Sequence, residues 1–117
     1  MANEVSIAVS LSYSKNGVSA IREESFKADV AGDSMTHAIQ SVGTGYELLT
    51  EVGQVGTAGW YFLKNLDPTN FVEFGEGDNE FAIKLLPGES TVFRASDPIG
   101  GKADTGDCLV EYMVIEL

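Results

Sequence analysis

The chain has very little of the chemistry that enzymes use. Cys108 is its only cysteine and His37 its only histidine. A single cysteine excludes a disulfide within the chain and a zinc cluster built from several thiolates. Because Cys108 begins an apolar run, we expect a small buried side chain instead of a nucleophile. We expect His37 to be a strand residue with a hydrogen-bond partner, since the companions for a metal site are missing. The prediction is a protein that is not an enzyme, with no catalytic residue, no cofactor and no metal.

Long apolar runs and clusters of basic residues are missing as well. No stretch reaches the roughly 20 apolar residues that cross a bilayer. The start, "MANEVSIAVSLSY", lacks the basic residues and the continuous apolar segment of a signal peptide. Lysine and arginine total 7 against 18 acidic residues, for a net charge of −11, and the basic residues are scattered singly. Nucleic-acid binding requires a basic patch. We therefore expect synthesis in a cytoplasm, and neither a membrane nor a nucleic acid as partner.

Alternation of apolar and polar residues is the strongest pattern that the sequence does contain. It runs from Val5 to Tyr13 and predicts a strand with Val5, Ile7, Val9 and Leu11 on one buried face. The Asn16-Gly17 pair then predicts a tight turn into a second strand, whose weaker alternation covers residues 26–30. The segment "MTHAIQSV" at 35–42 fits either a helical turn or a strand. We favour a strand, because eight residues are few for a helix.

The second half of the chain consists of short β-prone runs between turn signals. The runs cover residues 46–52, 60–66, 71–74, 81–86, 91–95 and 108–117, and the breaks are "DPTN", "GEGDN", "PGES" and "SDPIGGKADTGD". We interpret residues 67–70 as a hairpin corner that joins the strands on either side of it. Eight or nine such strands predict an all-β fold, an antiparallel β-sandwich of jelly-roll-like form, as a single domain over residues 1–117.

Two further patterns permit a binding site as well as a structural explanation. The loops "EGDNE" at 76–80 and "DTGD" at 104–107 gather carboxylates beside glycine, so two such loops meeting at one end of a sandwich would form a weak cation site. Solvated turns are the favoured explanation, since neither loop has EF-hand spacing. The aromatic residues around Trp60 suggest a stacking platform for sugar or, as we prefer, a mixture of core residues and residues that meet a partner.

Four stretches resemble a group of small virion structural proteins of tailed bacteriophages. They read "VSIAVSLSYSKNG", "GWYFLKNLDPTNFVEFG", "FAIKLLPGESTVFR" and "KADTGDCLVEYMVIEL". In that group an aromatic strand runs into a "KNLD-x-TN" corner, a "KL-x-PGE" turn follows, and the chain closes on "EY" and an aliphatic strand. The resemblance is weakest over residues 22–59. Its elements are turn signatures and strand patterns, so they specify a fold and a lineage better than an activity.

The resemblance implies a β-sandwich subunit that assembles on the phage particle. Within the virion we favour a capsid decoration, or cement, protein on the outside of the head, made in the host cytoplasm. Its expected partners are the major capsid protein and further copies of itself, as a homo-oligomer such as a trimer. The first strand and the C-terminal strand are long and apolar, so a neighbour is expected to cover one of them. The alternatives are a tail, neck or baseplate component and, from another class, a small carbohydrate- or receptor-binding module.

Overall fold

The computed structural model describes residues 3–49, 55–95 and 97–117, and all regular structure within these ranges is antiparallel β. The all-β prediction is therefore confirmed. No helix in these ranges has the length and hydropathy of a membrane span. Contacts divide the chain into two compact units, residues 1–31 and residues 32–117, which are described separately below. The prediction of one domain over residues 1–117 stays a prediction.

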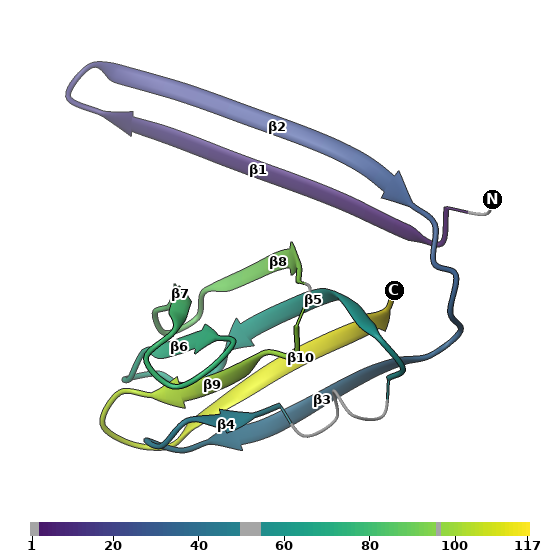
Figure 1. Cartoon of the computed structure of the whole chain (residues 1–117). Helices are drawn as coiled ribbons and strands as arrows, with labels where there is room; N and C mark the ends of the chain where they lie inside the picture. Colours follow the sequence, from purple (N-terminus) through teal and green to yellow (C-terminus); the bar gives the residue numbers. More distant parts are fainter. Residues whose placement is uncertain (1–2, 50–54, 96) are drawn as a thin grey trace. The chain divides into compact units, whose positions relative to one another are not determined.

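The first unit is a two-stranded ribbon. Strands β1 (Val5–Lys15) and β2 (Val18–Ala28) pair in register along their entire length (Figure 1). Asn16 and Gly17 form the turn with φ angles of 52° and 79°, and these left-handed values are what a two-residue hairpin loop requires. The predicted turn is confirmed. Strand β2 is much longer than residues 26–30, because it continues the pairing with β1 through a polar segment.

The second unit contains two four-stranded antiparallel sheets (Figure 1). The first, which we call the β10 sheet, has the order β3-β10-β5-β8, and the second, the β6 sheet, has the order β4-β9-β6-β7. The strands are β3 (Met35–Val42), β4 (Glu47–Leu48), β5 (Ala58–Asn65), β6 (Val72–Gly75), β7 (Phe81–Leu85), β8 (Ser90–Arg94), β9 (Gly100–Ala103) and β10 (Cys108–Glu116). Strand β3 confirms the choice of strand over helix. Strand β9 lies in a segment that we interpreted as a break, and part of the expected run 46–52 lies outside the described residues.

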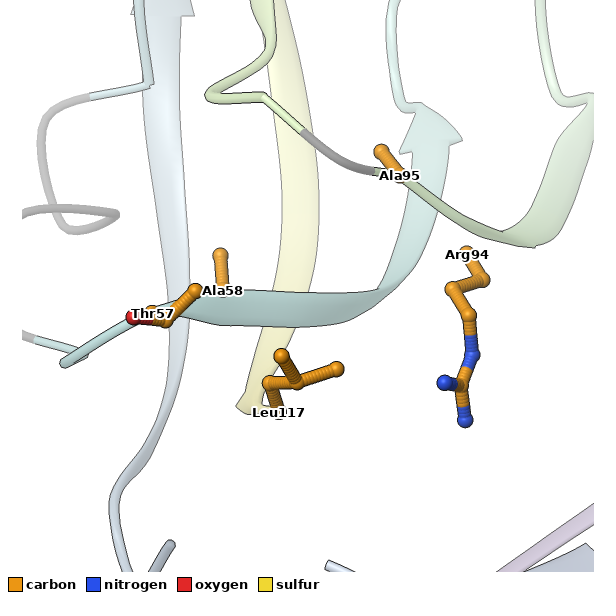
Figure 2. A pocket seen from close by; sticks show the side chains of 5 residues that line it. All are labelled: Thr57, Ala58, Arg94, Ala95 and Leu117. Carbon is orange, nitrogen blue, oxygen red and sulfur yellow. The ribbon is translucent and has the colours of Figure 1, made fainter.

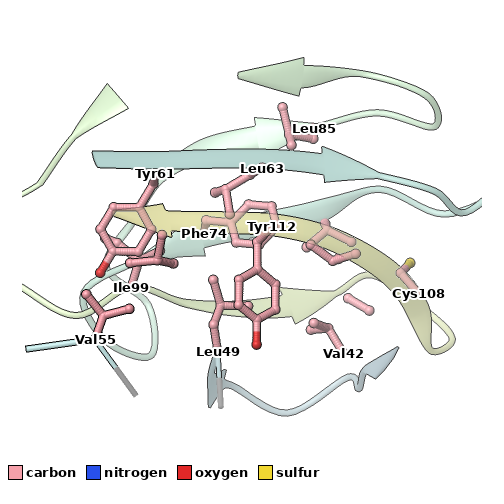
Figure 3. Close-up of a cluster of buried hydrophobic side chains, with 14 residues drawn as sticks. Val42, Leu49, Val55, Tyr61, Leu63, Phe74, Leu85, Ile99, Cys108 and Tyr112 are labelled. Atoms are coloured by element: carbon pink, nitrogen blue, oxygen red, sulfur yellow. The ribbon is translucent and has the colours of Figure 1, made fainter. Parts of the chain in front are cut away.

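Both sheets contribute to one hydrophobic core, in which the buried side chains lie between the two layers (Figure 3). Alternation along β10 turns Val110, Tyr112 and Val114 inward, and all three are fully buried. The intervening residues of β10 face outward. From the β6 sheet, Val72 and Phe74 fill the same interior. One row of β10 is thus buried and the alternate row is not, as alternation along a strand at the edge of a core requires.

The corner at residues 67–70 is not the hairpin that we predicted. Strand β5 before it belongs to the β10 sheet and strand β6 after it belongs to the β6 sheet, so the corner carries the chain from one layer to the other. Its local chemistry is as expected, since Asp67 Oδ2 accepts hydrogen bonds from the backbone of Thr69 at 2.9 Å and of Asn70 at 2.6 Å. The same side-chain caps suit hairpins and layer crossings, so sequence does not separate the two.

Asn65, at the end of β5, is the one buried polar residue among the described part of the core. Its Nδ2 donates to the carbonyl oxygens of Asn70 at 2.9 Å and Leu85 at 3.1 Å, and its Oδ1 accepts from the amide of Asp67 at 2.9 Å. One side chain thus joins the crossing corner to the end of β7. Sequence analysis treated Asn65 as an ordinary strand residue.

Candidate functional surfaces

His37 and Cys108 lie on adjacent strands but on opposite sides of the β10 sheet. His37 faces outward from β3, with Nε2 2.7 Å from Glu111 Oε2. Cys108 faces inward and is fully buried. Burial, and then the charges of nearby aspartates, raise the pKa of its thiol, so the nucleophilic thiolate is disfavoured. The two side chains cannot work as a catalytic pair, and both the buried cysteine and the hydrogen-bonded histidine are confirmed.

The acidic loops do not meet, so the proposed cation site between them is wrong. Strands β6 and β9 are antiparallel, and Gly75 pairs with Gly100 while Val72 pairs with Ala103. The loop after β6 and the loop after β9 therefore leave from opposite ends of this pair. Across the described ranges, no group of three or more histidine, cysteine, aspartate or glutamate side chains is arranged to hold a metal.

The aromatic residues around Trp60 divide between the core and the surface. Tyr61 and Phe74 are buried, and Tyr61 stacks on Phe93 with ring centroids 5.3 Å apart. On the outer side, the Arg94 guanidinium lies 4.6 Å from the Trp60 ring centroid, and Trp60 is only 9% exposed. A sugar would need an open ring face. Trp60 does not provide one, so the stacking platform is not supported.

A hollow of about 430 Å³ lies at one end of strand β5 (Figure 2). Thr57, Ala58, Arg94, Ala95 and Leu117 line it. Arg94 is the only charged side chain among them, and it already lies over Trp60. The hollow thus has few groups with which to orient a ligand, and we assign no ligand to it.

The ribbon β1–β2 has one apolar side and one polar side. Residues that pair across an antiparallel ribbon share a side, so the register assigns each residue. We call the apolar side the arm face: it consists of Val5, Ile7, Val9, Leu11, Tyr13 and Lys15 of β1 with Val18, Ala20, Arg22, Glu24, Phe26 and Ala28 of β2. The opposite side carries Ser6, Ala8, Ser10, Ser12 and Ser14 with Ser19, Ile21, Glu23, Ser25 and Lys27.

Most of the arm face is exposed, which corrects the prediction of a buried row on the first strand. Val5 is buried and Ile7 is partly buried, but Val9 is 46% exposed and Leu11 is 76% exposed. Tyr13, Val18 and Phe26 are exposed as well. The alternation correctly identified which side chains share a side. It did not show how far along the strand that side is buried.

A second apolar surface lies on the outward side of the β10 sheet, and we call it the sheet face. It consists of Met35, His37, Ile39 and Ser41 of β3, Leu109, Glu111, Met113 and Ile115 of β10, Trp60, Phe62 and Lys64 of β5, and Ser90, Val92 and Arg94 of β8. Ile39 is 61% exposed, and Met35 and Leu109 are also exposed. Exposed apolar side chains on β3 and at the start of β10 make this side of the sheet a candidate interaction site.

Neither surface shares the net negative charge of the chain. The arm face carries Lys15 and Arg22 against Glu24, and Arg22 Nη1 lies 2.5 Å from Glu24 Oε2. The sheet face carries Lys64 and Arg94 against Glu111. Together they hold four basic residues and two acidic ones, whereas the whole chain has 7 basic and 18 acidic residues. Each surface has a formal charge of +1 on a chain of −11, so acidic surfaces are not repelled there.

Comparison with protein-family models, with curated proteins and with solved structures finds no match to this chain. The candidate function therefore rests on the two apolar surfaces and on the sequence resemblance, which stays a prediction.

Proposed function

We propose that the protein is a non-enzymatic structural protein of a tailed-bacteriophage virion. In this proposal it is a capsid decoration, or cement, protein that binds the major capsid protein and stabilises the outside of the head. Its fold is a jelly-roll-like β-sandwich with an N-terminal β-ribbon. The two four-stranded antiparallel sheets around one core support the sandwich, and the phage-like sequence stretches support the lineage.

The exposed arm face is the observation that carries this proposal. An isolated two-stranded ribbon is marginally stable in water, and stability requires further strands or a surface packed against its apolar side. Here both strands are 11 residues long and Leu11, near the turn, is 76% exposed. Exposed apolar side chains lower the solubility of a free subunit, whereas assembly buries them. The ribbon therefore has the properties of an assembly element.

The distribution of charge supports a position on the outer surface of a particle. The acidic residues are concentrated away from the arm face and the sheet face, and they include the solvent-facing loops at 76–80 and 104–107. A particle that presents such surfaces stays dispersed. A tail, neck or baseplate component would use the same ribbon in the same way, so the experiment must separate heads from tails.

The test is to add purified protein to phage heads that lack it and, in parallel, to purified tails. We expect saturable binding to heads and a higher temperature of head disruption. Leu11→Glu on the arm face is expected to bind heads at least tenfold more weakly. The matched control is Ile21→Glu, which changes an exposed aliphatic residue on the polar side of the same ribbon and should bind like the wild type. Binding to tails alone would replace the head assignment, and binding to neither would refute the proposal.

A further inference from the structure

We infer that strand β1 pairs edge to edge with strand β1 of a second copy, which joins two ribbons into one four-stranded antiparallel sheet. The surface involved is the backbone edge of β1, which the proposed function does not use. The arm face of each copy stays free to bind a capsid. Pairing of this kind needs residues 5–28 only, so it does not depend on where residues 32–117 lie.

The turn of the ribbon determines which backbone groups of β1 are free. The two-residue turn with positive φ at both positions makes Lys15 and Val18 a hydrogen-bonded pair. Along an antiparallel pair, such positions alternate with positions whose N–H and C=O point away from the partner strand. The groups that point away from β2 therefore belong to the even-numbered residues of β1, which are Ser6, Ala8, Ser10, Ser12 and Ser14. All of them are exposed, and β2 is the only strand that pairs with β1 in the described part of the chain.

These free groups match the free groups of a second β1 that runs antiparallel to the first. Strand β1 has 11 residues, and its middle residue, Ser10, is one of those with free groups. Placing Ser10 opposite Ser10 of a second copy also places Ser6 opposite Ser14 and Ala8 opposite Ser12. Each of the resulting pairs exchanges two bonds, which gives about ten hydrogen bonds between the copies, related by a two-fold axis. A second β1 therefore fits this edge over the whole length of the strand.

Charge favours a second copy at the edge of β1 and opposes one at the edge of β2. Residues 5–14 contain no charged side chain and no proline, and the pairing of β1 has no bulge. The β1 edge thus lacks the features with which edge strands normally resist pairing. Strand β2 carries four charged residues, Arg22, Glu23, Glu24 and Lys27. Its middle residue is Glu23, so symmetric pairing of two β2 strands would place two glutamates opposite each other, which is destabilising.

Pairing through β1 also enlarges the apolar surface that the ribbon offers. In the symmetric register Val9 lies opposite Leu11, so the two arm faces lie on the same side of the joined sheet. Four strands about 4.8 Å apart, with 11 residues at about 3.4 Å each, give a surface of about 700 Å². One ribbon offers about half of this area, whereas a specific interface uses about 800 Å² per partner. The charged β2 strands then form both outer edges, so the assembly closes at two copies.

The test uses two matched proline variants of the purified full chain, each checked for folding by circular dichroism. Ser10→Pro removes an N–H that points away from β2, so it blocks the β1 edge without breaking a bond inside the ribbon. Ser25→Pro is the control, because it removes an outward N–H from the edge of β2. Light scattering after size exclusion should give 2 × 12.5 = 25 kDa for the wild type and the control at about 100 µM. We expect at least tenfold weaker association for Ser10→Pro.

Three results would overturn the pairing of β1 with β1. The first is a wild type that stays monomeric at this concentration, and the second is equal weakening by the two prolines. The third is a mass that keeps rising above two copies with concentration, because pairing through both edges of the ribbon does not close. A monomeric wild type that still binds phage heads through Leu11 would overturn the pairing and leave the proposed function in place.

A disulfide supplies a measurement that does not depend on a proline. Cα atoms of a hydrogen-bonded antiparallel pair lie about 5.5 Å apart, which is within the range that a disulfide spans. With oxidised glutathione, Ser10→Cys should therefore form a dimer linked by a disulfide. Ser25→Cys, on the β2 edge, is the control and should give little dimer, and the native Cys108 is buried. Equal yields of dimer from the two positions would contradict pairing through β1.

Discussion

Asn65 provides the sharpest test of the core, because one side chain joins three segments. Replacing it with alanine removes three hydrogen bonds, to the carbonyls of Asn70 and Leu85 and from the amide of Asp67. Each such bond contributes about 1 kcal/mol net, and each buried group left without a partner costs about 1–3 kcal/mol. We therefore expect Asn65→Ala to lower the free energy of unfolding by about 3–5 kcal/mol. A domain of this size is stable by only about 5–10 kcal/mol, so this is a large share.

Asn65→Asp keeps the shape of the side chain and changes its chemistry. A carboxylate has no N–H to donate, so it would face the carbonyl oxygens of Asn70 and Leu85 with acceptors only. Burial raises the folded-state pKa of such a carboxyl above the unfolded value of about 3.9. The folded state then binds more protons than the unfolded state, and stability falls as pH rises. We expect the deficit of Asn65→Asp to grow between pH 4 and pH 7.

The assay is urea unfolding followed by tryptophan fluorescence, since Trp60 is the only tryptophan. Thr105→Ala is the control: it removes an exposed hydrogen bond to the side chain of Asn70, 2.8 Å long, from the same corner. That loss should cost less than about 0.5 kcal/mol, as surface substitutions usually do. A cost below about 1 kcal/mol for Asn65→Ala, or a deficit of Asn65→Asp that does not change with pH, would refute the role assigned to this residue.

Two further predictions follow from close contacts in the two-sheet unit. Glu116 Oε1 accepts hydrogen bonds from the Ser34 hydroxyl at 2.5 Å and from the Ser34 and Asp33 amides at 3.0 Å, and the hydroxyl is the main cause of a pKa below the ordinary 4.5. A carboxylate whose pKa is lowered by folding stabilises the folded state at pH values above its unfolded pKa, so Glu116→Gln should have a lower melting temperature than the wild type at pH 7. In thermal scans this difference in melting temperature should shrink as the pH falls through 4.5 toward 3. A difference that widens on acidification would contradict the prediction. Gly75→Ala would place Cβ 1.9 Å from the Glu80 carbonyl oxygen, so we expect urea unfolding to show a free energy of unfolding lower by at least about 3 kcal/mol. The control is Gly45→Ala, which has nothing within 4 Å of the new Cβ and should cost less than about 0.5 kcal/mol. Equal costs would contradict the prediction, because they would mean that the backbone shifts at Gly75 to remove the clash.

Periodicity and turn chemistry were sufficient for strands whose own residues favour β structure. Strands β3, β7, β8 and β10 lie where the apolar runs predict them. Strand β9 was missed because its sequence, "GGKA", has almost no β propensity. It is a strand because it pairs with β4 and β6. Its glycines are required by close neighbours, since a Cβ on Gly100 would lie 2.5 Å from the Glu47 carbonyl oxygen and one on Gly101 would lie 3.0 Å from the Phe74 ring. Such requirements arise from strands far apart in the sequence.

Residue identity was informative about the chemistry of single positions and poor at deciding which positions meet. The buried thiol of Cys108 and the capping carboxylate of Asp67 behave as expected. The layer crossing at residues 67–70 and the separation of the acidic loops depend instead on sheet order and register. Neither is encoded locally, because a turn sequence does not specify which sheet receives the next strand. Asn65 was missed because its burial, and its bond to Leu85 at the end of β7, depend on how the sheets pack.

The ribbon shows what alternation does and does not establish. Apolar residues at every second position indicate only that one side of a strand is covered. Either the same chain or another molecule can provide the cover. In β1 the residues after Ile7 are exposed, while the apolar row continues through Val9, Leu11 and Tyr13 to the turn. If the sequence were constrained only by solubility of the single chain, the exposed positions Val9, Leu11 and Tyr13 would not need to be apolar. The opposite side, where serine occupies all but one of the β1 positions, shows that polar residues fit this ribbon. The apolar row therefore extends beyond its buried part, and its continuation is best explained by a surface that covers it on assembly.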